Sequence, residues 1–224
     1  MEANRETRIS HEWIYHYIYA DKRAGGDLHK HLRSQKKHRK RYGSNDRRGQ
    51  IPDRVSIEER PAIVDQRKRL GDWEADTVIG QKSRYALVTL VDRKSRFSLI
   101  KKIDQRTAAA TKNAIIQMLK PYKLKTLTIT FDNGKEFTAH QDMARELDAD
   151  MYFAHPYASW ERGTNENTNG LLRQYFPKGS DFSKITDAQV KCAENRLDAR
   201  PRKCLGARTP EMVFFDICVV ALDT

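Results

Sequence analysis

The chain has 224 residues but only three cysteines, and no two of them have the C-x-x-C spacing of a zinc knuckle. A sparse, odd set of this kind favours free thiols in a reducing compartment over a disulfide framework. The longest apolar stretch, residues 212–222, contains Asp216 and is shorter than the ~18 residues that a membrane span needs. The first residues do not have the pattern of a signal peptide. We therefore expect a cytoplasmic protein with no membrane partner.

Acidic residues are scarce in one part of the chain. Between Lys22 and Gln50 there are eleven lysines and arginines and two acids, so 11 − 2 = +9 of the net charge of +12 lies there. Such an excess points to a polyanionic partner, and the cations predict phosphate binding that weakens steeply with salt. The alternative is a solvated charge run. The candidate DNA-binding residues of this arm are Lys36, Lys37, Arg39, Lys40 and Arg41.

Three segments follow from the composition. Residues 1–50 combine the basic arm with one short helix that starts after the N-cap Ser10 and has no evident packing partner. Residues 51–70 are mixed in character and predict a linker. Residues 71–224 contain the β-like and helical patterns of a single globular core.

Within that core, hydrophobic periodicity predicts an α/β fold. Three strand patterns joined by hairpin-length turns form an antiparallel meander, and two later strands alternate with helices. The order is βββαβαβα, a mixed five-stranded sheet flanked by helices. The strands are expected at 72–79, 86–91, 97–103, 126–132 and 150–155, and the helices at 107–120, 139–147, 164–176, 185–199 and 209–215.

Three acids fall on elements that can converge. Asp76 lies in the first strand pattern, Asp132 ends the fourth, and Glu166 lies in the first turn of the helix expected after Thr164 as N-cap. Clustered carboxylates repel one another, and divalent cations relieve this repulsion. Alternation alone does not distinguish Asp76 from Asp72 and Glu74. Glu166, taken alone, is equally an acid that complements the helix dipole.

Several other side chains are candidates for DNA contact. Arg173 lies nearly two turns beyond Glu166, and Asn169 lies between them on the same face. Lys135 and Arg162 are candidate phosphate contacts. For His155 and Trp160 we expect packing and loop-shaping rather than catalysis, because aromatic residues are mostly core residues.

Four runs carry a resemblance to a known family. They are Gly71-Asp-Trp-Glu-Ala-Asp-Thr-Val78, Asp132-Asn-Gly-Lys-Glu-Phe137, Pro156-Tyr-Ala-Ser-Trp-Glu-Arg-Gly-Thr-Asn-Glu-Asn-Thr-Asn-Gly170 and Arg200-Pro-Arg-Lys-Cys-Leu-Gly206. With 33 residues between Asp132 and Glu166, the chain resembles the DDE transposases of the bacterial insertion-sequence 30 family, whose core has the ribonuclease H-like fold of retroviral integrases. The similarity extends from about Ile9 to Phe215.

The resemblance implies that Asp76, Asp132 and Glu166 form the catalytic triad and hold Mg²⁺, with Mn²⁺ as a substitute and two ions in all. It implies DNA cleavage at element ends and strand transfer into target DNA. The implied partners are terminal inverted repeats, target DNA and further copies of the chain in a multimer on DNA, associated with the nucleoid. Arg173 matches the basic residue expected near the reacting phosphate.

The chain also departs from the family pattern. Family members usually have a longer N-terminal region with helix-turn-helix modules, and Asp198 stands where asparagine is usual. These departures leave open a truncated, non-catalytic DNA-binding remnant. A cellular ribonuclease H or resolvase shares the fold and the metals, but does not account for the run from Trp160 to Asn169.

Overall fold

The computed structural model describes residues 9–32, 51–81, 84–156 and 158–217. The chain divides into two compact units, Met1–Asp46 and Arg47–Thr224. The arm residues 36, 37 and 39–41, predicted to bind DNA, lie outside the described residues. Within those ranges, no helix is both long and apolar enough to cross a bilayer. Cys192 and Cys204 are exposed free thiols, as predicted.

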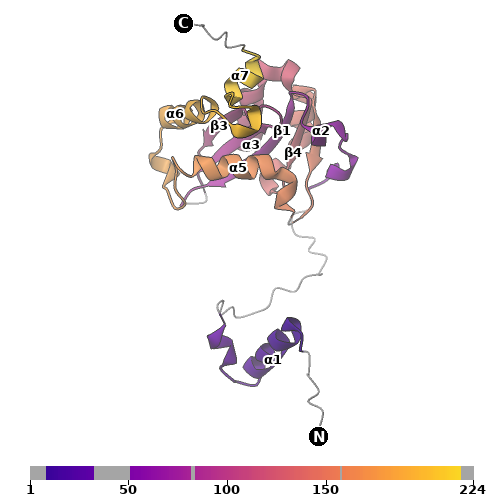
Figure 1. Cartoon of the computed structure of the whole chain (residues 1–224), viewed down its shortest axis with the longest axis vertical. Coiled ribbons are helices and arrows are strands. Elements are labelled where there is room, and N and C mark those ends of the chain that lie inside the picture. The colour runs from indigo at the N-terminus through magenta and orange to yellow at the C-terminus, as the bar shows by residue number, and fades with distance from the viewer. Residues whose placement is uncertain (1–8, 33–50, 82–83, 157, 218–224) are drawn as a thin grey trace. The chain divides into compact units, whose positions relative to one another are not determined.

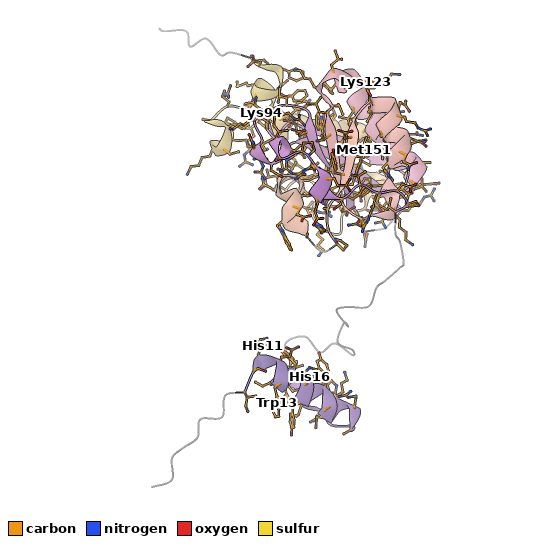
Figure 2. All side chains as sticks on the ribbon, turned by 90° about the vertical axis from the view of Figure 1, so that its right-hand side faces the viewer. His11, Trp13, His16, Lys94, Lys123 and Met151 are labelled. Carbon is orange, nitrogen blue, oxygen red and sulfur yellow. The ribbon has the colours of Figure 1, made fainter. Side chains whose placement is uncertain are left out.

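The N-terminal unit contains α1 (His11–Arg23) and a short 3-10 helix, η1 (Leu28–His31). Ser10 is the N-cap as predicted, because its hydroxyl accepts a hydrogen bond of 3.2 Å from the Trp13 amide. The rings of Trp13 and Tyr17 stack at 5.6 Å. No residue of α1 is buried, and Figure 2 shows Trp13 and His16 projecting from the helix.

The second unit contains one five-stranded sheet with the strand order β3-β2-β1-β4-β5 (Figure 1). Strands β1, β2 and β3 form the antiparallel meander, and β4 and β5 add in parallel beside β1. This arrangement confirms the predicted mixed α/β sheet. The strands are β1 (Asp72–Ile79), β2 (Ala86–Asp92), β3 (Ser98–Ile103), β4 (Thr128–Phe131) and β5 (Asp150–Phe153).

Helices cover both faces of the sheet. One face packs on α3 (Ala108–Leu119), α4 (His140–Leu147) and α7 (Pro210–Phe215), with Trp73 and Phe214 among the buried side chains. The other packs on α5 (Gly163–Leu172) and α6 (Asp187–Asp198), and α5 crosses the strands in Figure 1. Because side chains alternate along β1, Glu74 and Asp76 point to the α5 side.

Residues 51–70, expected to be a linker, pack against the core instead. Ile51 and Val64 are buried, and the segment forms the 3-10 helix η2 (Ile57–Glu59) and the short helix α2 (Ile63–Gln66). The Phe153 amide donates to the Val55 carbonyl at 2.9 Å, so the segment lies along the outer edge of β5. The sequence does not predict this packing, because the buried apolar residues of the segment are isolated and do not form a periodic apolar face.

The other sheet edge is covered by α6. The amides of Ser98 and Ile100 on β3 donate to the carboxyls of Asp198 at 3.0 Å and Glu194 at 2.6 Å. Burial raises the pKa of Asp198 to about 8, against the lowering effect of its hydrogen bonds with Ser98. The folded protein therefore holds a proton on Asp198 at pH values where the unfolded chain does not.

This proton makes stability depend on pH. A carboxyl with a raised folded-state pKa stabilises the fold fully below its unfolded value of 3.8 and loses that contribution as pH rises to about 8. Asp198→Asn removes the titration. We expect wild type to lose up to about 1.4 kcal/mol of unfolding free energy per pH unit relative to the variant in this window. Urea titrations from pH 4 to 9 measure it, and parallel curves for the two proteins would contradict it.

Candidate active site

Two of the three predicted acids lie near each other on neighbouring parallel strands, Asp76 within β1 and Asp132 directly after β4. Strands β1 and β4 pair in register up to Glu74 and Thr130, so Asp76 and Asp132 come two residues later on each chain segment. The guanidinium of Arg162 lies between them, with its Nη1 3.6 Å from Asp76 Oδ2 and its Nη2 3.7 Å from Asp132 Oδ2. A single cation therefore reaches both carboxylates.

Arg162 is not the surface cation that we expected. Its side chain is 12% exposed, its Nη1 donates to the Ala75 carbonyl at 3.4 Å, and its Nε is buried without a hydrogen-bond partner. Arg162, the residue directly before α5, faces the two carboxylates. Its predicted contact with DNA phosphate remains a prediction, and its position beside the aspartates is what the geometry adds.

Asp76 has a perturbed acidity. Burial raises the pKa of Asp76 to about 6, Arg162 opposes this rise, and the charge of Asp132 reinforces it. The Thr77 amide donates to Asp76 Oδ1 at 2.8 Å and fixes the carboxyl. Because ionisation of a buried carboxyl is unfavourable, a nearby cation stabilises its charged form. The carboxylate oxygens of Asp76 and Asp132 are hard ligands that fit Mg²⁺ or Mn²⁺.

Asn169, whose predicted contact with DNA remains a prediction, is hydrogen-bonded to Asp76. Its Nδ2 donates to Asp76 Oδ2 at 2.9 Å, and its Oδ1 lies 3.0 Å from the Thr89 hydroxyl on β2. Asn169 is thus the link between α5 and the strand that carries Asp76. The helical spacing predicted that Asn169 shares a face of the helix with Glu166. It did not predict the hydrogen bond to Asp76, because Asp76 lies 93 residues earlier in the chain.

Glu166 is exposed on α5, and no hydrogen bond or ion pair joins it to the two aspartates. In the described part of the chain, no group of three or more His, Cys, Asp or Glu side chains is close enough to hold a metal ion. The membership of Glu166 in the triad therefore remains a prediction.

The start of α5 differs from expectation. The helix begins at Gly163, and its N-cap residue is Arg162, whose side chain makes no capping hydrogen bond. Thr164, expected as the N-cap, lies inside the helix, and its hydroxyl accepts from Arg96 Nη1 at 2.7 Å. The N-cap prediction was wrong because this threonine serves a tertiary contact.

The two remaining cations have different surroundings. Arg173, the C-cap of α5, donates from Nη2 to the Ile79 carbonyl at 3.0 Å, so it ties α5 to the end of β1. Lys135 is exposed on the 3-10 helix η4 (Lys135–Phe137), directly after Asp132 and its loop. Of the two, Lys135 has the freer side chain for a phosphate contact.

Sequence reasoning missed Glu136. Its Oε1 accepts from the Thr77 hydroxyl at 2.7 Å, and its charge helps raise the pKa of Asp76. A Cβ atom at Gly134 would lie 2.8 Å from both Asp132 Oδ1 and the Glu136 carboxyl. A larger residue at position 134 would therefore have to displace these two carboxyl groups. The signal was the position of Glu136 within the run that begins at Asp132.

The expected packing of Trp160 was wrong, since 75% of its surface is exposed, whereas its role in shaping the loop stays a prediction. Trp160 lies on the 3-10 helix η5 (Ser159–Arg162), two residues before Arg162. A cavity of about 420 Å³ opens beside Asp132, and its lining includes Asn133, His155 and Arg162. Of the two aspartates, Asp132 therefore borders an open cavity rather than a closed core.

Comparisons with known proteins agree with this geometry. A family model described as an integrase core domain matches residues 66–159, which include Asp76 and Asp132. The chain is similar to a solved catalytic core domain of HTLV-2 integrase in complex with magnesium, at 21% identity and a TM-score of 0.51, over 65% of this chain and 97% of that one. This likeness shows a ribonuclease H-like fold.

Two transposases are more similar in sequence. The transposase of insertion sequence IS4351 from Bacteroides fragilis is 49% identical over 93% of this chain and 64% of its own length. The InsI transposase of IS30A from Escherichia coli K12 is 36% identical over 92% of this chain and 55% of its own. The chain thus spans between about half and two thirds of these relatives. It belongs to the family of insertion-sequence transposases that includes the IS30 transposases, with an integrase core domain.

Proposed function

We propose that the chain catalyses metal-dependent cleavage of DNA at insertion-sequence ends and strand transfer into target DNA. One observation carries the proposal: Asp76 and Asp132, on adjacent parallel strands, share a single cationic group in a chain of this family. Asp76 and Asp132, with Glu166 from α5, would hold the divalent cations. When bound, Mg²⁺ or Mn²⁺ supplies charge stabilisation to the attacking and leaving oxygens of phosphoryl transfer.

The chain's own residues prepare this site. The Thr77 amide and the Asn169 side chain hold the two oxygens of the Asp76 carboxyl in place. Arg162 neutralises part of the charge of the aspartates and lines the cavity beside Asp132, where a DNA phosphate would approach. Water is the nucleophile for cleavage, and the freed 3′-OH is the nucleophile for transfer, so no protein nucleophile is required.

DNA is the proposed partner, in the form of element ends and target. Lys135 and the basic arm, with Lys36, Lys37, Arg39, Lys40 and Arg41, supply phosphate contacts, whose affinity falls with salt. Arg173, at the C-terminal end of α5, would contact DNA near the reacting phosphate. Cleavage of paired ends needs more than one active site, so we propose a homo-multimer on DNA in the nucleoid.

The test is nicking of a supercoiled plasmid by the full chain in Mg²⁺ or Mn²⁺, with wild type beside Glu166→Gln. We expect wild type to nick and the variant to lose at least about 10²-fold in rate, since it loses a charged ligand. Glu146→Gln is the matched control, because Glu146 is an exposed helical glutamate on α4.

Two outcomes would count against the proposal. If Glu166→Gln nicks as fast as wild type, Glu166 has no part in the triad. If wild type is folded and binds DNA at low salt but does not nick, the chain is a DNA-binding remnant without catalysis.

A further inference from the structure

Helix α5 lacks a cap of its own. The first four amides of a helix have no partner within it, and the N-cap residue Arg162 offers none. One of these amides, that of Asn165, donates at 2.8 Å to Glu74 Oε2 on β1. A carboxylate from a neighbouring strand therefore does what an N-cap side chain usually does, and its charge also suits the positive end of the helix.

Glu74 is itself fixed on every side. Its side chain is fully buried, and its Oε1 accepts from Arg93 Nη1 at 2.6 Å. Asn165 also donates a second hydrogen bond, from its Nδ2 to the Glu74 main-chain carbonyl at 3.1 Å. Strand and helix are thus joined by two hydrogen bonds between the same two residues. The ion pair with Arg93 gives the buried carboxyl group a charged partner.

A second contact repeats the first one turn further along α5. Asn169 is four residues after Asn165, and it donates to Asp76, which is two residues after Glu74. Two strand residues span about 6.6 Å, and four helix residues span about 6 Å. The spacings match, so the pairs Glu74–Asn165 and Asp76–Asn169 hold α5 in one register along β1.

Thr89 on β2 lies between the two asparagines. Its hydroxyl is 3.1 Å from Asn165 Oδ1 and 3.0 Å from Asn169 Oδ1. A hydroxyl has one proton to donate, so the two amide oxygens share it. The side-chain contacts of Asn165 and Asn169 thus lie on the face of α5 that packs on the sheet, and Asn165 directly precedes Glu166.

We infer that Glu74 is a positioning residue, which sets the placement of Glu166 relative to Asp76 by fixing the first turn of α5 on β1. The inference rests on the proposed function. Asp76 is held to the helix by Asn169, and Glu166 follows Asn165 directly, so the distance between the acids depends on the register of these contacts. Glu74 acts through α5 and does not touch the reacting atoms.

The test compares Glu74→Gln with wild type in the plasmid assay. Glutamine keeps the shape, but its amide group is a donor, so it cannot accept from both Arg93 and the Asn165 amide. We expect about 10²-fold slower turnover at saturating DNA, because small misplacements of reacting groups have effects of this size. The dissociation constant for plasmid DNA should change less than about threefold, since no DNA contact is removed.

Asp198→Asn is the matched control, because Asp198 is another buried carboxyl that accepts a backbone amide, and it lies on α6. Its turnover should equal that of wild type. Should Glu74→Gln fail to fold, Asn165→Ala takes its place: it removes the side-chain bond to the Glu74 carbonyl and should slow turnover about tenfold, again without loss of DNA affinity.

Amide hydrogen exchange separates this inference from the proposed function. In Glu74→Gln the amides of residues 165–168 should exchange faster than in wild type, and in Asp198→Asn they should not. Unchanged turnover in a folded Glu74→Gln, or equal loss in Asp198→Asn, would overturn the inference. If wild type proves inactive, the proposed function fails, and hydrogen exchange alone tests whether Glu74 fixes the first turn of α5. Unchanged protection of the α5 amides in Glu74→Gln would overturn this role of Glu74, whereas faster exchange would support it.

Discussion

Replacement of Asp132 by asparagine should reduce metal-dependent nicking by at least about 10³-fold. A carboxylate ligand contributes charge stabilisation of several kcal/mol through its cation, and each 1.4 kcal/mol is about tenfold in rate. The same change should weaken Mn²⁺ binding, measured by calorimetry on the full chain. The Asp132 side chain is 37% exposed, so the fold should lose little stability.

Asp142→Asn is the control for this prediction. Asp142 has a similar exposure of 45% and also faces cations, namely Lys112 and Arg145. Nicking by this variant should match that of wild type. If Asp132→Asn retained Mn²⁺ affinity and nicking rate, the pair of aspartates would not be the metal site, whatever its geometry.

Replacement of Arg93 by methionine should destabilise the core by about 3–5 kcal/mol, because it leaves the buried Glu74 carboxylate without its cation. Both side chains of this pair are almost wholly buried, at 4% for Arg93 and 0% for Glu74. Arg93 also reaches the Val64 carbonyl and Asp65, so its loss frees the segment before β1 as well. Urea unfolding followed by circular dichroism measures the change.

The matched control is Arg145→Met on α4, where the arginine pairs with Asp142 but is 78% exposed. An exposed ion pair contributes little, so this variant should stay within about 0.5 kcal/mol of wild type. Equal stabilities for Arg93→Met and wild type would show that the Glu74 carboxyl finds another partner or takes up a proton at no measurable cost.

The sequence predicted the fold well because the core is periodic. Strands β1 to β5 are alternating or continuous apolar runs, and the helices end at prolines or begin at polar caps such as Thr107 and Thr209. These signals are local in the chain, so they can be recognised without tertiary information. The packing of residues 51–70 on the core could not be predicted from the sequence, because it depends on isolated contacts such as that between Arg60 and Thr130.

The site was predictable only in part. The strand positions of Asp76 and Asp132 follow from the pattern, and the structure brings these acids together. The positions of Arg162, Asn169 and Glu136 around them do not follow, because each depends on a partner about 60 to 90 residues away in sequence. The polar residues at the start of α5 suggest a solvent-exposed helix, but Thr164 and Asn165 are buried against the sheet.

The covered edges of the sheet limit how copies of this chain can associate. Backbone amides of β3 are occupied by the carboxyls of α6, and β5 is lined by the segment that contains Val55. A strand from another molecule would have to displace these groups before it could pair, which also protects the protein from edge-to-edge aggregation. The proposed multimer on DNA would therefore use helices and loops as its contact surfaces, so that the sheet stays intact when copies join.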